Sequence, residues 1–477
     1  MLQNLWRRDA LSICSCLLMI IALTDNASGQ NSSGEVGVVK PQLALKSSTH
    51  LQPVTESSMV SAVSSYFDPA QGSSSSDLVR RAITSNMELS AARLEIERAR
   101  ARMRQSSFIP NPTFDFEHTT GKMTGSSAER ETSMGVSMPL ELFGQRRNRI
   151  NLARVEIEAA EAEVADRERR LSAEVRAAYS EAIAAISELQ ITEELNDLDV
   201  KTARIVEVRV TQGDASPLES NLLQVEIERL RSRRTIVLGR LQAAMLKLKT
   251  LVGIPFAETL KLREELSSPD VAEPAGSVEA ALGLALSLRP DLKLARLVEE
   301  MAQAGSSLAK AQSAPGVTLF SRYTVSQSQF DSTPVGPLRD KDRLLTFGVS
   351  IGIPLFNRNQ GAKAEAEAAI LQARHRREFV EAMIRSEVMT AYARYEAAKS
   401  ALAIYREGVL ARSSQNIRSI RGAYEIGAFR ITDLLVEQRR FIDFQREFIE
   451  AQAERFRALT DLRMAVGIPD APVAGKK

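Results

Sequence analysis

The chain has 477 residues, a length that by itself would suggest about three domains. Its 62 Lys and Arg residues nearly balance 60 Asp and Glu residues, and the net charge is +2. This balance argues against a nucleic-acid partner. Both cysteines, Cys14 and Cys16, lie within the first 30 residues. If that segment is removed, the mature chain has no disulfide and must be stabilised by packing or by oligomerisation.

Residues 1–30 are predicted to be a secretory signal peptide. Two arginines precede an apolar run from Leu11 to Leu23, and small residues follow it, which is the order typical of such signals. A membrane anchor is one alternative, although the run is short for a span, and a lipid-anchored cysteine is another. Residues 31–75 are rich in Ser, Gly, Val and Pro and are expected to be a flexible lead-in.

Most of the chain repeats one order of elements twice, over residues 76–262 and 278–470. A linker is predicted at 263–277 and a C-terminal tail at 471–477. Matching marks recur 214 or 215 residues apart, so a duplicated element is predicted and function should follow from stacking its copies. The marks are Pro139 and Pro354, Gly213 and Gly427, and Gly253 and Gly467.

The predicted elements of the two copies correspond one to one. After a first helix, each copy has two alternating strands, a very long helix, a glycine-centred tip and a return helix. About 67 residues without proline would form a helix roughly 100 Å long. In the first copy these elements are strands at about 111–118 and 132–141, a long helix at 145–211, a tip at 212–217 and a return helix at 218–251. In the second they are strands at about 316–326 and 344–354, a long helix at 360–425, a tip at 426–431 and a return helix at 432–466.

The long helices carry apolar residues at coiled-coil spacing. Val388, Ala391, Tyr395 and Ala398 are separated by three and four residues in turn, and a similar series begins at Ile150. Helices of this length need such a seam, so each long helix is predicted to pair with its return helix as a coiled-coil hairpin.

The predicted strands are amphipathic. Phe347, Val349 and Ile351 alternate with Gly348 and Ser350, and the other three strands show similar alternation. Strands of nine to eleven residues suit a tilted crossing of a bilayer, whereas a soluble sheet packed on helices is the alternative. Four strands cannot close a barrel in lipid, because open edges would leave backbone groups unpaired. A membrane location would therefore require several identical chains to pool their strands.

Motifs at the tips and repeat ends give the chain a family resemblance. Together they resemble the TolC-type outer membrane efflux proteins over nearly everything after about residue 75. The segments at 142–147 and 354–361 are similar to the heavy-metal (cobalt–zinc–cadmium) resistance branch of that family. The motifs are Tyr424-Glu425-Ile426-Gly427 with Thr432-Asp433-Leu434-Leu435 and Gln438, Gly213 with Leu218-Glu219 and Gln224, and Gly-Ile-Pro at 253–255 and 467–469.

The resemblance implies a mainly α fold with membrane β. Duplicated long-helix coiled-coil hairpins would form a periplasmic tunnel, and four strands per chain would contribute to a trimeric twelve-stranded β-barrel in the outer membrane. Such a homotrimer would be a passive exit duct of a tripartite efflux system. Its partners would be a periplasmic adaptor, also called a membrane fusion protein, and an inner-membrane pump, with no cofactor and no enzymatic activity.

The resemblance also implies that the helix tips control passage. The predicted gate residues are Gly213, Asp214, Glu219, Gly427 and Asp433. Three copies of Asp433 around an axis would form an acidic ring favouring cations, although Val436 stands where the family has a second acid. Alternatively, Asp433 and Glu219 complement the N-terminal dipole of a return helix. Pro217, Phe429 and Arg430 are candidates for adaptor docking, and their alternative role is exposed turn chemistry.

No catalytic or metal-binding set is predicted. The three histidines, His50, His118 and His375, fit no ligand spacing. Within transport, the exit duct of a type I protein secretion system is an alternative with the same architecture. A periplasmic coiled-coil adaptor would carry one helical hairpin between β domains, whereas this chain has two predicted hairpins and four strands.

Overall fold

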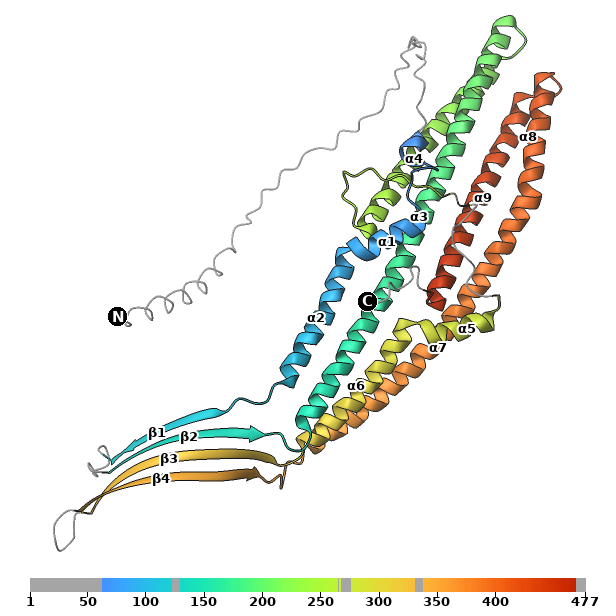
Figure 1. Ribbon diagram of the computed structural model, residues 1–477. Coiled ribbons are helices and arrows are strands. Elements are labelled where there is room, and N and C mark those ends of the chain that lie inside the picture. The colour runs from blue at the N-terminus through green and yellow to red at the C-terminus, as the bar shows by residue number, and fades with distance from the viewer. Residues whose placement is uncertain (1–61, 122–128, 265, 267–275, 331–337, 469–477) are drawn as a thin grey trace, which may run out of the picture. The chain divides into compact units, whose positions relative to one another are not determined.

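The computed structural model describes residues 62–121, 129–264, 266, 276–330 and 338–468 (Figure 1). The predicted signal peptide and C-terminal tail lie outside the described residues, as does most of the predicted linker. Among the described residues, no helix is long and apolar enough to cross a membrane.

The helices of the two repeats alternate in the same order of short, medium and very long elements. A left-handed residue, Gly144 or Asn359, precedes the first helix after each strand pair. The first repeat contains α1 (Ser75–Ser85), α2 (Met87–Ser107), α3 (Gln145–Gln212) and α4 (Pro217–Val252). The second contains α5 (Val278–Leu288), α6 (Pro290–Gln312), α7 (Gln360–Ile404), a π-helical turn η3 (Tyr405–Val409), α8 (Leu410–Glu425) and α9 (Ile431–Val466).

The strands form one antiparallel sheet in the order β1-β2-β3-β4. Its members are β1 (Thr113–Thr120), β2 (Arg130–Leu140), β3 (Gly316–Phe330) and β4 (Leu338–Gly352). The hairpin β1–β2 of the first repeat thus pairs with β3–β4 of the second through β2 and β3. In Figure 1 the sheet lies at one end of the long helices α3 and α7.

Helix α3 is the centre of the helical part. It packs against α4 of its own hairpin, against α1 and α2, and against α6 and α9 of the second repeat. Tyr179 of α3 stacks on Phe456 of α9, with ring centroids 6.4 Å apart. The predicted seam on α3 is therefore incomplete: Val155, Ala159 and Ala162 are also buried, against Leu297 of α6. A helix with neighbours on several sides needs more than one apolar stripe.

The second long helix differs from its predicted continuous form over 360–425. The π-helical turn η3 (Tyr405–Val409) separates α7 from α8. Val388, Ala391, Tyr395 and Ala398 of the predicted seam are buried. Tyr405 and Val409, which continue the same spacing inside η3, are only half-buried. An extra residue in a turn shifts the apolar stripe around the helix, and such π turns are common at functional sites.

The lead-in predicted to be flexible over 31–75 is packed from residue 62 onward. A 3₁₀ helix, η1 (Ala62–Ser65), begins it, and both Phe67 and Ser73 form parallel bridges with Leu262. Apolar side chains of this segment pack against the main core cluster. The composition predicted a solvated segment, but its few apolar side chains pack against buried residues of the core.

The second strand pair is longer than predicted. β3 and β4 each have 15 residues, and their ladder extends to Phe330 opposite Leu338. Apart from this last pair, the added residues are polar or charged, and the apolar pattern could not mark them as strand. Backbone hydrogen bonds hold the ladder whichever side chains it carries.

Candidate functional site

The first hairpin turns at Gly213, whose φ of 83° is left-handed and favours glycine. The N–H of Asp214 donates to the carbonyl of Arg209 over 2.8 Å, which ends α3. Ser216 then accepts a hydrogen bond from the N–H of Leu218 at 3.3 Å, and Pro217 is the first residue of α4. This turn is stabilised by its own backbone and caps.

The second hairpin turns in the same way at Gly427, with a φ of 78°. The N–H of Ala428 donates to the carbonyl of Ala423 over 2.8 Å. Asp433 is exposed, and its Oδ2 accepts a hydrogen bond from the N–H of Arg430 at 3.1 Å. Its carboxylate thus caps the start of α9, where it also opposes the positive end of the helix dipole.

One contact joins the polar residues of the two tips. The hydroxyl of Tyr424 on α8 donates to Oε2 of Glu219 on α4 over 3.3 Å, and the Arg209 guanidinium lies 5.5 Å from the Tyr424 ring centroid. Burial raises the pKa of Tyr424, and the Glu219 carboxylate adds to the rise. Beneath this contact lies an apolar cluster drawn from all four helices. Its members are Val206, Leu223, Ile417, Tyr424, Ile431, Leu434 and Leu435.

The other predicted tip residues remain separate and exposed. Asp214, Pro217 and Arg430 are open to solvent, and Phe429 is 49% exposed. Ile426, beside Gly427, is 82% exposed. Of the predicted gate and docking residues, only Glu219 reaches across to the other hairpin. The structure therefore leaves these turns free to contact another molecule.

A buried carboxylate lies deeper between the two hairpins. Asp199 of α3 is 1% exposed, and Nε2 of Gln438 on α9 donates to its Oδ1. Its Oδ2 has no hydrogen-bond partner among the described residues. Burial raises the pKa of Asp199 to about 6; the Glu226 charge also raises it, while Gln438, Arg421 and Arg229 oppose the rise. An ionised Asp199 is thus costly in this position.

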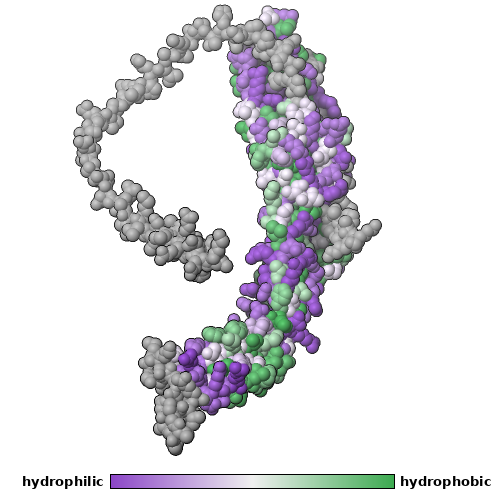
Figure 2. Space-filling model, turned by 60° about the vertical axis from the view of Figure 1, so that its left-hand side comes forward, coloured by the Kyte–Doolittle hydropathy of each residue, from purple (hydrophilic) through white to green (hydrophobic). Residues whose placement is uncertain are grey.

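The sheet has one continuous apolar face. Its register aligns side chains of the same face in rows across the strands, and these rows contain almost only apolar residues. The large members are between 41% and 72% exposed, and Figure 2 shows hydrophobic residues gathered at this end of the chain. They are Phe114, Phe116, Met134, Val136, Leu319, Tyr323, Leu345, Phe347, Val349 and Ile351.

The opposite face of the sheet is mainly polar and acidic, with Phe320 and Leu344 as large apolar residues on it. Register places five carboxylates on it, in phase with its glycine, serine and threonine residues. Arg322 is the basic residue of this face and lies 3.8 Å from Glu117. The carboxylates belong to Asp115, Glu117, Glu131, Asp340 and Asp342.

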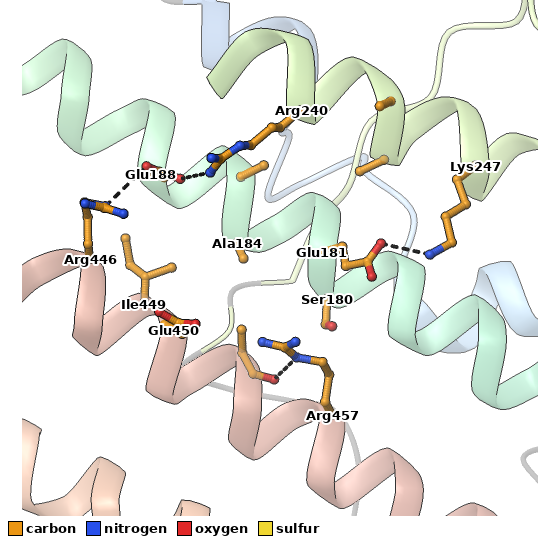
Figure 3. A pocket seen from close by; sticks show the side chains of 14 residues that line it. Ser180, Glu181, Ala184, Glu188, Arg240, Lys247, Arg446, Ile449, Glu450 and Arg457 are labelled. Atoms are coloured by element: carbon orange, nitrogen blue, oxygen red, sulfur yellow. Dashed lines mark hydrogen bonds and ion pairs between the residues drawn. The ribbon is translucent and has the colours of Figure 1, made fainter. Parts of the chain in front are cut away.

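A groove of about 570 Å³ runs between α4 and α9 over α3 (Figure 3). Alanines lie along it, including Ala184 of α3 and Ala243 of α4. Arg240 and Arg446 approach Glu188 from opposite walls, at 3.7 and 3.6 Å. Small residues between charged walls leave room for a further helix to approach closely.

Sequence reasoning missed Tyr424 and the acidic face as functional groups. Tyr424 stood within the tip motif, and only the contact with Glu219 on the other hairpin gives it a role. The position of the acids on one face could have been predicted from the sequence, because Asp115 and Glu117 alternate with Phe114 and Phe116 along the strand. The buried position of Asp199 depends on α9, more than 200 residues away in the chain, and had no local signal.

The described residues define a class of protein: a duplicated hairpin of long helices joined to a four-stranded sheet with one exposed apolar face. This fold is found in solved outer membrane channels. One CusC structure covers 82% of this chain and 92% of its own, with a TM-score of 0.66 and 24% identity. The open state of MtrE from Neisseria gonorrhoeae covers 82% and 88%, with a TM-score of 0.66 and 20% identity.

The chain belongs to the outer membrane efflux protein family, whose model matches residues 78–254 and 281–468. Among curated proteins, it is 24% identical over 393 residues to the cobalt-zinc-cadmium resistance protein CzcC of Cupriavidus metallidurans. That match covers 80% of this chain and 87% of CzcC. The predicted family is confirmed, as is the predicted mainly α fold with four strands per chain, and the protein is an efflux channel of the outer membrane.

Proposed function

We propose that three copies of this chain form the exit duct of a tripartite efflux system that exports cations. The observation that carries this proposal is the exposed apolar face, which extends over all four strands of the sheet. An apolar face of this extent is stable only when lipid or protein covers it. The helical hairpins would then lie on the periplasmic side as a tunnel.

The sheet edges supply the argument for a homotrimer. Within the described part of the chain, β1 and β4 each have a strand neighbour on one side only, and unpaired backbone groups are very costly in lipid. Pairing β4 of one copy with β1 of the next removes both edges. Two copies would give eight strands, whose interior is filled by side chains, whereas three give twelve and leave an open lumen.

The acidic face supports a cationic cargo. If the apolar face contacts lipid, the five carboxylates of the opposite face line the lumen of the barrel. Rings of carboxylates raise the local concentration of cations in a pore. The name of the similar protein CzcC, cobalt-zinc-cadmium resistance protein, agrees with divalent cations as cargo. The channel would conduct them passively, since the pump supplies the energy.

The hairpin tips would form the periplasmic gate and meet the adaptor. Asp433 at the start of α9 and Glu219 at the start of α4 place carboxylates near the entrance, and the Tyr424–Glu219 hydrogen bond would stabilise the closed arrangement. The exposed Asp214, Pro217, Phe429 and Arg430 would contact the adaptor. The alanine-lined groove of Figure 3 offers a second surface on which an adaptor helix could lie.

The exit duct of a protein secretion system is the second candidate, since one architecture serves both. Planar-bilayer recordings test cation export with full-length protein. We expect a heat-dissociable trimer whose current is cation-selective, and we expect Asp340→Asn with Asp342→Asn to weaken that selectivity. Expression of the protein should restore zinc resistance to a deletion strain only when the adaptor and the pump are also present. A water-soluble monomer would contradict the duct, and unselective current would contradict the cationic cargo.

A further inference from the structure

The apolar face of the sheet changes character near the strand ends that lie away from the helices. One row further from the helices than Tyr323 and Leu345, the register aligns His118, Thr132, Val325 and Arg343. The row after it aligns Thr120, Arg130, Gln327 and Lys341. The same face therefore passes from apolar to basic within two rows, and Figure 2 shows hydrophilic residues beside the grey loops at this end.

The charges of the sheet are sorted by face in this region. Residues 340–343 read Asp-Lys-Asp-Arg, and alternation directs the two acids to the polar face and the two cations to the apolar one. Arg130, Lys341 and Arg343 are all exposed. Among the described residues of the sheet, none forms an ion pair with these three side chains. Their charge is thus available to a ligand outside the chain.

The spacing of these cations suits more than one anionic group. Arg130 and Lys341 stand in one row on strands separated by β3, which places their backbones about 10 Å apart. Lys341 and Arg343 are two residues apart on β4, or roughly 7 Å. Phosphate groups on a sugar headgroup span a similar distance, whereas a single phosphate would contact only part of the set.

We propose that Arg130, Lys341 and Arg343 bind the phosphates of a multiply phosphorylated glycolipid in the outer leaflet of the outer membrane. The acyl chains of this lipid would lie along the apolar rows that contain Tyr323, Leu345 and Phe347. The proposal rests on the proposed function, because it needs the apolar face to contact lipid and the helices to lie in the periplasm. The cations then stand at the outer edge of the apolar band.

The arrangement favours a lipid over a free anion. The cations stand on an open sheet face, and the large apolar side chains beside them are exposed as well. A ligand that contacts both must be an amphiphile. Lys and Arg near an anionic membrane surface each contribute about 1 kcal/mol, which is roughly fivefold in affinity. Neutralising three of them should therefore lower lipid affinity at least tenfold.

Native mass spectrometry of the detergent-purified, full-length channel tests the proposal. The probes are bisphosphorylated lipid A, dephosphorylated lipid A and phosphatidylglycerol. The test variant combines Arg130→Gln, Lys341→Gln and Arg343→Gln, and the matched control combines Asp340→Asn and Asp342→Asn on the other face of the same strand. We expect at least tenfold weaker binding of bisphosphorylated lipid A by the test variant, and no loss in the control.

Several results would overturn the proposal: unchanged binding by the test variant, an equal loss in the control, or equal binding of either other lipid by the native protein. If the triple variant fails to assemble, Arg343→Gln alone should weaken binding roughly fivefold, and an unchanged affinity would be equally decisive. Bilayer recordings separate this proposal from the exit duct, because a channel that conducts without binding the glycolipid leaves the duct intact.

Discussion

The two repeats share one fold but stabilise it with different chemistry. In the first, Asn86 separates α1 from α2, and its Nδ2 donates to the carbonyl of Leu251 at the end of α4, over 2.9 Å. In the second, Arg289 occupies the same place between α5 and α6, and its Nη1 donates to the carbonyl of Ala465 near the end of α9, over 3.1 Å. Each side chain ties the last turn of a return helix to its repeat.

The repeats also differ in length and continuity. Helix α3 has 68 residues without interruption, whereas η3 separates α7 from α8. The N-caps Ser74 and Ser277 lie 203 residues apart, but the N-caps Gly144 and Asn359 lie 215 apart. The second repeat is therefore twelve residues longer over this stretch: α6 has 23 residues where α2 has 21, and the segment that contains the strand pair accounts for the other ten. The two copies therefore keep the same hairpin geometry but differ in charge and in length.

Among the variants that test the difference between the repeats, replacement of Arg289 should lower the free energy of unfolding most. Arg289 is buried and binds Asp291 through two nitrogens at 2.9 and 2.5 Å and Glu387 at 2.6 Å. Arg289→Ala leaves Glu387 without this partner and Asp291 with only the more distant Arg169, at 3.9 Å, and should cost about 3–5 kcal/mol. Asn86→Ala removes a cap and one carbonyl contact and should cost about 1–2 kcal/mol. Thermal unfolding followed by circular dichroism ranks the two variants by melting temperature. Equal decreases in melting temperature would show that the α1–α2 and α5–α6 junctions contribute equally to stability, which would contradict the expected difference.

The buried contact of Asp199 on α3 with Gln438 on α9 joins the two hairpins and should make the stability of the protein depend on pH. The folded-state pKa of Asp199, about 6, lies above the ordinary 3.8. The stability from this site is therefore fully present below 3.8 and is lost as the pH rises through 6. The full shift corresponds to about 3 kcal/mol, of which roughly 1.3 kcal/mol falls between pH 7 and pH 5. We expect the melting temperature to rise when the pH falls from about 7 to about 5.

Asp199→Asn should remove most of this pH response, because an amide keeps an oxygen that accepts from Gln438 and carries no charge. Asp433→Asn is the matched control, since Asp433 is exposed and caps only its own helix. If the two variants respond to pH alike, Asp199 is not the group responsible.

Tyr424→Phe should shift the balance between the closed and the open channel, by a smaller free energy than the changes expected at Arg289 and Asp199. It removes the hydroxyl that donates to Glu219 and leaves the ring in its apolar cluster. A hydrogen bond contributes about 1 kcal/mol, so the open population should rise roughly fivefold. Tyr405→Phe is the matched control, because the Tyr405 hydroxyl donates to Glu447 within the second hairpin, over 3.1 Å. Single-channel recordings that show the same change in both variants would place the gate elsewhere.

The sequence predicted the helices and the tips well because their signals are local. Gly213 and Gly427 mark turns through backbone conformation, and the apolar spacing near Val388 marks a seam. Two kinds of feature were not predictable. The contacts of Asp199 and Tyr424 join segments more than 200 residues apart, and the ladder of β3 and β4 continues through charged residues because backbone bonds alone define it.

Packing likewise decided how the segment after residue 62 behaves. Its composition predicted a flexible lead-in, but Phe67 and Ser73 pair with Leu262. No sequence pattern within the segment predicts that it pairs with Leu262. Local signals therefore predict elements, and the assembly of elements decides which polar residues become functional.

The smallest expected effect concerns the tip glycines and tests whether the turns are equivalent. Gly213 and Gly427 have φ values of 83° and 78°, and a Cβ at either would meet no atom within 4 Å. Gly213→Ala and Gly427→Ala should therefore cost only the left-handed conformation, about 1 kcal/mol each. Gly253→Ala should cost more, because its Cβ would lie 2.6 Å from the carbonyl oxygen of Ser85. Equal small shifts in melting temperature at the two tips would show that both turns depend on backbone geometry alone. A larger loss at one tip, measured in the assembled channel, would mean that this turn is constrained by a neighbouring copy, and the gate would then be asymmetric between the repeats.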